Sequence, residues 1–229
     1  MPNNSRYRNK PCGYCGRTTG ERGEGDHVLP KTLYPTITDP RVQRAKIPCC
    51  PECNDSWQRD EGHFRTAIDM CGPKMTAERE EIWGDACRSF QRPDGGTKDR
   101  EAIAELLVPH VTSGGSDEST HKIFPLKDQR ILRVLRKIVR GLTYRHTGDI
   151  IADETRVQLI DCNVEELPEL IRIAYHVPRV FTAWAFVTDL CVGPMNIHSI
   201  WHLRFFDNAL ITAIVLRSDQ NEKPGHPAV

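Results

Sequence analysis

Long apolar runs are missing from this sequence. Nowhere do ~18 consecutive apolar residues occur, the length that a membrane-spanning helix needs. The first ten residues, Met1 to Lys10, are polar and basic with no apolar segment behind them, which is unlike a secretory signal peptide. We therefore expect a cytoplasmic protein that has no membrane partner.

A net charge is missing as well. The 31 Lys and Arg residues balance 31 Asp and Glu residues, so the whole chain has no net field that would attract a polyanion. Nucleic-acid binding is neither supported nor excluded by this balance and would have to come from local basic patches. Apolar residues make up 38% and charged residues 27%, which suffices for a core and excludes a disordered chain. For 229 residues we expect a small module plus a larger body, although one medium unit is also compatible with this length.

The cysteines do not suggest a disulfide framework. There are nine, an odd number, and four of them form two C-x-x-C pairs, which in a reducing compartment indicates a metal site. We interpret the scattered ones as small buried apolar side chains, with Cys49 left open: Cys49, Cys71, Cys87, Cys162 and Cys191.

The two C-x-x-C pairs have the composition of a closed tetrahedral zinc site. Cys12 and Cys15 lie on one tight turn, and Cys50 and Cys53 follow about 35 residues later. Cys49 beside Cys50 makes the register ambiguous, but only Cys50 has the two-residue spacing to Cys53. We predict a structural zinc ion that stabilises a segment too small to have a sufficient core.

Residue patterns predict an α+β protein. Residues 1–74 are rich in Gly, Pro, Cys and charge, and their longest expected helix starts after Cys53, with Asn54 as N-cap, and runs to Met70. A connector at 75–120 should hold helices at Thr76 to Phe90 and about Asp99 to Val108, then a flexible polar loop at Thr112 to Thr120.

The remainder, 121–217, predicts a helix packed on an antiparallel sheet. Ile131, Val134, Leu135, Ile138 and Leu142 repeat with helical period, which indicates a helix from Leu126 to about Tyr144. Strands are expected at Val157 to Ile160, Val180 to Thr188, Ile197 to Phe206 and Ala209 to Leu216, with a hairpin turn at Asp207-Asn208. Residues 218–229 form a polar tail.

Between the cysteine pairs lies the segment Gly25-Asp26-His27-Val28-Leu29-Pro30. With Cys12-Gly13-Tyr14-Cys15-Gly16 before it and Ile47-Pro48 and Cys50-Pro51-Glu52-Cys53-Asn54 after it, this segment resembles the HNH endonucleases, in particular their four-cysteine subgroup. The resemblance extends through Ser56, Asp60-Glu61 and Phe64-Arg65, so it covers roughly 10–65. It implies a ββα-metal module in which zinc is a structural staple.

The resemblance also implies the site residues. Asp26 and Asn54 would ligate one Mg²⁺ or Mn²⁺ ion, and His27 would be the general base. The chemistry agrees, because a hard cation prefers oxygen ligands and a neutral imidazole can take a proton from water. Two positions depart from the family pattern: Ala45 stands where many members have an Asn that braces the histidine loop, and Trp57 where many have Lys.

Further nucleic-acid contacts are expected from basic residues. Arg65 is a candidate phosphate contact or an ordinary structural Arg, and His63 a candidate third metal ligand or backbone contact. Arg133, Lys137 and Arg140 lie along one side of the predicted 126–144 helix and would either track a phosphate backbone or form a solvated face. The aromatic residues of the predicted strands, Trp184, Trp201, Phe205 and Phe206, are expected in the core.

These observations lead to three functional hypotheses. The first is an endonuclease that hydrolyses phosphodiester bonds, with DNA as the expected partner and RNA as the other candidate. The second is a zinc-dependent nucleic-acid-binding or scaffold protein without catalysis, motivated by Ala45 and Trp57. The third is a nuclease subunit that is switched on by a protein partner, a small molecule or self-association.

Overall fold

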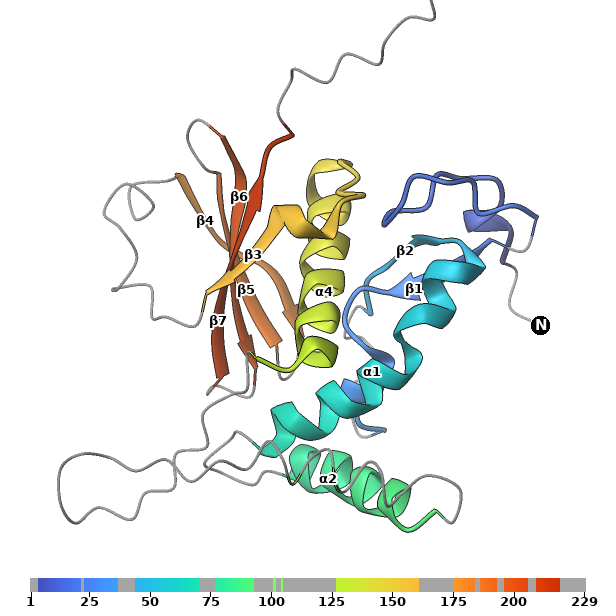
Figure 1. Cartoon of the computed structure of the whole chain (residues 1–229), viewed down its shortest axis with the longest axis vertical. Coiled ribbons are helices and arrows are strands. Elements are labelled where there is room, and N and C mark those ends of the chain that lie inside the picture. The colour runs from blue at the N-terminus through green and yellow to red at the C-terminus, as the bar shows by residue number, and fades with distance from the viewer. Residues whose placement is uncertain are drawn as a thin grey trace, which may run out of the picture.

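The computed structural model describes residues 4–21, 23–36, 44–70, 77–92, 101, 104, 127–160, 175–183, 186–192, 196–205 and 209–218. Helices and antiparallel sheets are both present, as expected of an α+β chain. In Figure 1 the molecule has three layers, with helix α4 between a C-terminal sheet on one side and an N-terminal hairpin and helix α1 on the other.

The N-terminal part is a two-stranded hairpin followed by a long helix. Strand β1 (Glu24–His27) pairs antiparallel with β2 (Lys46–Cys49), and Asp26 lies opposite Ile47. Helix α1 (Pro51–Met70) follows at once. Two short 3₁₀ helices, η1 (Asn4–Tyr7) and η2 (Lys31–Leu33), flank the first strand.

Helix α1 begins earlier than expected, so the prediction of Asn54 as its N-cap is wrong. The Asn54 backbone N–H already donates to Cys50 O at 3.0 Å, which places Asn54 within the first turn. Pro51 explains the shift, because proline suits the first helical position, where its missing N–H costs nothing. The start of α1 therefore coincides with the second cysteine pair.

Helix α2 (Ala77–Phe90) packs against α1, close to the predicted bounds. Arg79 of α2 forms a buried ion pair with Asp69 of α1, with Nε 3.2 Å from Oδ1. The predicted helix at 99–108 and the predicted loop at 112–120 fall almost wholly outside the described residues.

Helix α4 (Gln129–Thr147) confirms the most periodic segment of the sequence, shifted by three residues. Asp128 sets its start, because the carboxylate accepts from the Arg130 backbone N–H at 2.8 Å. Gly148 ends it with φ of 82°, a left-handed conformation that glycine adopts without strain.

The C-terminal sheet has the strand order β3-β7-β6-β5-β4, and every pair is antiparallel. Its strands are β3 (Val157–Ile160), β4 (Tyr175–Ala183), β5 (Phe186–Val192), β6 (Ile197–Phe205) and β7 (Ala209–Leu216), and η3 (Glu154–Arg156) precedes it.

Three of the four predicted strands are confirmed, but the strand predicted at Val180 to Thr188 is wrong. Those residues belong to two strands, since Ala183 pairs with Phe186 across a hairpin. The apolar composition continues through the reversal without Gly, Pro, Asn or Asp, so no turn signal interrupts it. The β6–β7 hairpin is confirmed by the pairing of Phe205 with Ala209, and its turn residues lie outside the described ones.

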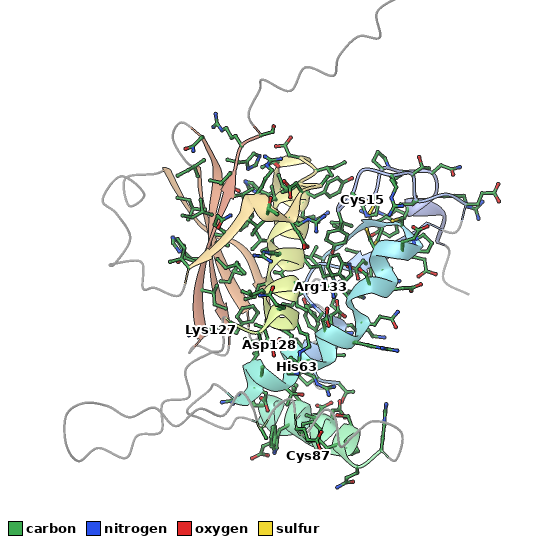
Figure 2. All side chains as sticks on the ribbon, viewed as in Figure 1. Cys15, His63, Cys87, Lys127, Asp128 and Arg133 are labelled. Atoms are coloured by element: carbon green, nitrogen blue, oxygen red, sulfur yellow. The ribbon has the colours of Figure 1, made fainter. Side chains whose placement is uncertain are left out.

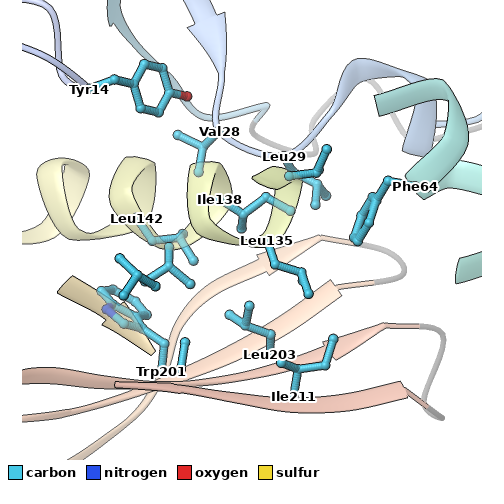
Figure 3. Close-up of a cluster of buried hydrophobic side chains, with 14 of the residues drawn as sticks. Tyr14, Val28, Leu29, Phe64, Leu135, Ile138, Leu142, Trp201, Leu203 and Ile211 are labelled. Atoms are coloured by element: carbon cyan, nitrogen blue, oxygen red, sulfur yellow. The ribbon is translucent and has the colours of Figure 1, made fainter. Parts of the chain in front are cut away.

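One buried apolar cluster crosses all three layers. Figure 3 shows Leu135, Ile138 and Leu142 of α4 between the hairpin side and the sheet. Trp201 and Phe205 of the sheet are buried as expected, and the Phe205 ring meets Phe64 of α1 edge to face with centroids 5.5 Å apart. The predicted N-terminal module and C-terminal domain therefore share a continuous core.

Helix α4 is thus buried on two sides rather than one. At Gly141, a Cβ atom would lie 3.1 Å from a methyl of Val28, so α4 approaches the segment after β1 closely.

Among the helices of the described ranges, none combines the length and apolar content that crossing a membrane requires.

Replacing Asp128, the N-cap residue of α4, tests what fixes the start of this helix. Asp128→Ala removes the acceptor for the Arg130 N–H and the hydrogen bond with the His63 ring, so the free energy of unfolding should fall by about 1–2 kcal/mol. Urea denaturation measures the change. Asp153→Ala is the matched control, because Asp153 caps only the exposed η3 turn. Equal losses in the two variants would contradict the role of Asp128.

Candidate functional site

Four cysteines converge where the N-terminal loop meets the start of α1. The sulfur atoms of Cys12, Cys15, Cys50 and Cys53 all lie within 4.8 Å of one another. The Gly13 backbone N–H donates to Pro48 O at 2.8 Å, which fastens the first pair to strand β2. In Figure 2, Cys15 lies beside the first turns of α1.

The donor set fits a metal ion such as zinc. Hydrogen bonds from Cys49 and Cys53 lower the pKa of Cys12 far below its usual range, whereas the hydrogen bond to Cys12 and burial raise the pKa of Cys53. One thiolate thus suppresses ionisation of its neighbours unless a cation compensates the charge. Four sulfurs at this separation are the ligands of a closed tetrahedral site.

The predicted register of the second pair is confirmed. Cys50, not Cys49, joins the cluster of four. Cys49 is buried on strand β2, with its sulfur atom 3.4 Å from Cys50 O. Of the other cysteines, Cys87 on α2 is only partly buried, so the expectation of a core position is wrong there. Cys71 and Cys162 lie outside the described residues, and the side chain of Cys191 is not described.

Asp26 lies in a network of buried polar groups. Its Oδ2 atom accepts from the Tyr14 hydroxyl at 2.7 Å and is 2.8 Å from the Lys137 ammonium. Lys137 also pairs with Glu61 and donates to the His27 backbone carbonyl at 3.0 Å. Because an ammonium has three protons, these three acceptors satisfy Lys137 completely although its side chain is fully buried.

Burial and neighbouring charges shift the pKa values of the groups in this network. Burial raises the pKa of Glu61, although the adjacent Lys137 opposes the change. Burial and the Asp26 carboxylate together raise the pKa of Tyr14 well above its usual range, so its hydroxyl remains a donor. Within the described ranges, both contacts to Asp26 use Oδ2.

Lys137 and Arg140 do not form the surface that the sequence predicted. Both expectations, a phosphate-tracking stripe and a solvated face, are wrong for them, because Lys137 is 0% and Arg140 4% exposed. Arg140 donates to the carbonyls of Tyr14 at 2.5 Å and Ile151 at 2.7 Å. The hairpin covers this side of α4, so the two cations join α4 to the N-terminal part.

Arg133 is the exposed member of the predicted stripe, and it also has internal partners. Its guanidinium is 2.6 Å from Asp60 and lies 5.5 Å from the centroid of the Trp57 ring. Trp57 is buried and packs at 5.9 Å from the Tyr14 ring. Trp57, which stands where many HNH endonucleases have Lys, is therefore a packing residue.

His27, the predicted base, ends strand β1 and is half-buried. Burial lowers its pKa to about 4, helped by Lys46 and opposed by Asp26. The ring is therefore neutral at physiological pH, as a proton acceptor must be. Its Nδ1 atom is buried without a hydrogen-bond partner among the described residues.

Asn54 is half-buried in the first turn of α1, and no hydrogen bond links it to Asp26 or His27 in the described part of the chain. The contacts in the described part of the chain thus join Asp26 to Lys137 and Tyr14. Ala45, where the family pattern has a bracing Asn, accepts the Val28 N–H at 3.0 Å through its backbone. The main chain itself therefore fastens the segment after His27.

His63 contacts Asp128 at the start of α4. Its Nε2 atom lies 3.0 Å from Asp128 Oδ2, which ties α1 to the start of α4, and Figure 2 shows the two side chains adjacent. One ring nitrogen of His63 is thus taken by Asp128, and its role as a third metal ligand stays a prediction. Arg65 lines a cavity between α1 and α2.

Sequence reasoning did not assign roles to Tyr14 and Glu61 or the true role of Lys137. One signal was present: Gly141 follows Lys137 by one helical turn, and a glycine within a helix indicates that another segment approaches that face. No family model, no curated protein and no solved structure matches this chain.

Metal analysis tests the cysteine cluster. The purified protein should contain about one zinc per chain, and Cys12→Ser or Cys53→Ser should lose it and lower the melting temperature, because structural zinc contributes to folding. Cys49→Ser is the matched control and should keep the metal. If Cys49→Ser lost zinc while Cys50→Ser retained it, the assignment of the ligands would be wrong.

Substituting Lys137 tests the buried network. Lys137→Met leaves the carboxylates of Asp26 and Glu61 without their cation, so the free energy of unfolding should fall by about 3–5 kcal/mol. Adding Glu61→Gln should recover part of the loss. Urea denaturation measures both, with Lys127→Met at an exposed site as control. A Lys137→Met protein as stable as the control would contradict the network.

Proposed function

We propose that this protein is a metal-dependent endonuclease of the HNH, ββα-metal type, with DNA as its substrate. The observation that carries the proposal is the four-cysteine cluster, which holds the loop before the hairpin of Asp26 and His27 against the first turn of the helix that bears Asn54. The order of hairpin, helix and cysteine pairs supports the resemblance in the sequence.

The donor set agrees with a divalent cation. Asp26 offers Oδ1 and Asn54 its amide oxygen, and Mg²⁺ or Mn²⁺ prefers such ligands with open positions for water and phosphate. When bound, the ion supplies electrostatic stabilisation to the developing charge on the phosphate and the leaving oxygen.

Side chains of the protein accept the proton and position the metal ligand. His27, neutral because it is partly buried, accepts a proton from the attacking water. Tyr14 and Lys137 hold Asp26 through Oδ2 and so fix the direction of its carboxylate. The Lys137 bond to the His27 carbonyl fixes the same strand, so α4 positions both residues.

A second candidate function is nucleic-acid binding without cleavage. The observation that favours it is the Lys137 ammonium, which already compensates the charge of Asp26 and so weakens the attraction for a second cation. This candidate predicts binding that depends on salt and is indifferent to substitution of His27.

Plasmid cleavage decides between the two candidates. Wild-type protein should nick supercoiled DNA in Mn²⁺ or Mg²⁺. His27→Ala should reduce the rate by at least about 100-fold, the usual contribution of a general base. Asn54→Ala should raise the metal concentration needed. His146→Ala, at an exposed histidine on the last turn of α4, should cleave as wild type does.

Equal rates of plasmid cleavage by wild type and His27→Ala, with zinc content unchanged, would contradict the role of His27 as the general base. No cleavage of DNA or RNA in any divalent metal by folded, zinc-loaded protein would overturn the endonuclease, and retained salt-dependent binding would then support the second candidate.

A further inference from the structure

A pocket of about 550 Å³ lies between helices α1 and α2 and takes no part in the site described above. Its lining is strongly basic: four arginines and one carboxylate contribute, and the carboxylate, Asp85, is already paired with Arg88. The other three arginines are Arg59, Arg65 and Arg92. A chain with no net charge thus concentrates positive charge in one cavity.

Arg65 is the residue that points to a ligand. Its Nε atom is buried and has no hydrogen-bond partner among the described residues, although the side chain carries a charge. Burial lowers the pKa of Arg65 and Arg92 adds to the effect, whereas the nearby carboxylates of Asp85 and Asp69 oppose it. Asp69, one turn later, pairs instead with Arg79. An incoming acceptor would satisfy this buried donor.

The chemistry of the missing acceptor follows from the shape of arginine. A guanidinium presents parallel N–H groups that match two oxygens of a phosphate or carboxylate. Exposed arginines at the rim, Arg59 and Arg92, add attraction without specificity for sequence. A phosphodiester of a nucleic acid fits these features, since it carries one charge and two unbonded oxygens.

The position of the pocket sets its distance from the candidate cleavage site. Arg65 follows Asn54 by 11 residues, slightly more than three full turns, so the two lie on the same face of α1 about 16 Å apart along its axis. One strand of DNA advances ~3.4 Å of helix axis per phosphate, so this span corresponds to about five nucleotides.

We propose that the α1–α2 pocket binds a backbone phosphate of the nucleic-acid substrate, with Arg65 as its main ligand, about five nucleotides from the bond that is cut. The site makes the enzyme dependent on substrate length, because short oligonucleotides cannot reach both positions. The spacing rests on the proposed function, whereas the binding of a phosphate in the pocket does not require catalysis.

Binding of a fluorescent 20-base-pair duplex, measured by anisotropy in the full-length His27→Ala protein, tests the pocket. Arg65→Ala should weaken binding by about tenfold or more, because a charge-assisted hydrogen bond contributes about 1.5–3 kcal/mol. For Arg65→Ala, the slope of the logarithm of the binding constant against the logarithm of the salt concentration should become shallower by about one unit. Arg65→Lys, which keeps the charge but loses the fork, should give an intermediate affinity.

Two controls make the result specific. Arg145→Ala removes the same charge from an exposed site on α4 and should bind as the parent does. A three-nucleotide oligomer should bind parent and Arg65→Ala alike. Unchanged zinc content and melting temperature in Arg65→Ala exclude loss of the fold as the cause.

Three results would contradict a phosphate site in the pocket. Arg65→Ala could bind the duplex as tightly as the parent does, Arg145→Ala could lose as much duplex affinity as Arg65→Ala does, or the parent could fail to bind the duplex. Inorganic phosphate that binds the parent as tightly as the duplex does would show a small-anion site instead. If Arg65→Ala cleaved DNA as fast as wild type does, the phosphate site in the pocket would be wrong and the endonuclease would stand. If binding depended on Arg65 but no cleavage occurred, the phosphate site would stand and the endonuclease would be wrong.

Discussion

A single buried ammonium, that of Lys137, joins helix α4 to the N-terminal hairpin and to helix α1. It reaches from α4 to the Asp26 carboxylate and the His27 carbonyl on β1 and to Glu61 on α1. A buried charge is costly unless every proton has an acceptor, so the hairpin, α1 and α4 must meet in one arrangement to satisfy it. The C-terminal part thereby fixes the strand that bears the candidate catalytic residues.

The four-cysteine cluster constrains the same strand and helix from the other end. It holds the loop before β1 against the first turn of α1, while Lys137 holds β1 against the middle of α1. Between these two fastenings lie Tyr14, which bonds Asp26, and Trp57, which packs on Tyr14. The site is therefore preorganised by metal ligation on one side and by a buried ion network on the other.

Local signals predicted much of this fold. The spacing of Cys50 and Cys53 identified the cluster because two thiols on one turn have few other uses, and the period of Ile131, Leu135 and Ile138 located α4. Boundaries were missed where a single residue decides them, as Pro51 does for α1. The β4–β5 hairpin was missed because no turn residue marks it.

Long-range contacts were the part that the sequence could not predict. Lys137 and Arg140 look like surface residues on a helical projection, and only the hairpin packed against them makes them buried. Likewise, Arg65 looks like any helical arginine until α2 closes a pocket beside it. Chemistry that arises from two segments distant in sequence depends on tertiary packing, which residue spacing does not encode.

The central claim is that Asp26, held by Lys137 and Tyr14, shares a divalent cation with Asn54 beside the base His27. Anomalous diffraction from crystals of the full chain grown with Mn²⁺ and an uncleavable DNA duplex tests it most directly. The account predicts a manganese peak bound by Asp26 and Asn54, with His27 facing the phosphate. A duplex bound elsewhere, or Asp26 bound by Lys137 with no manganese beside it, would contradict the account.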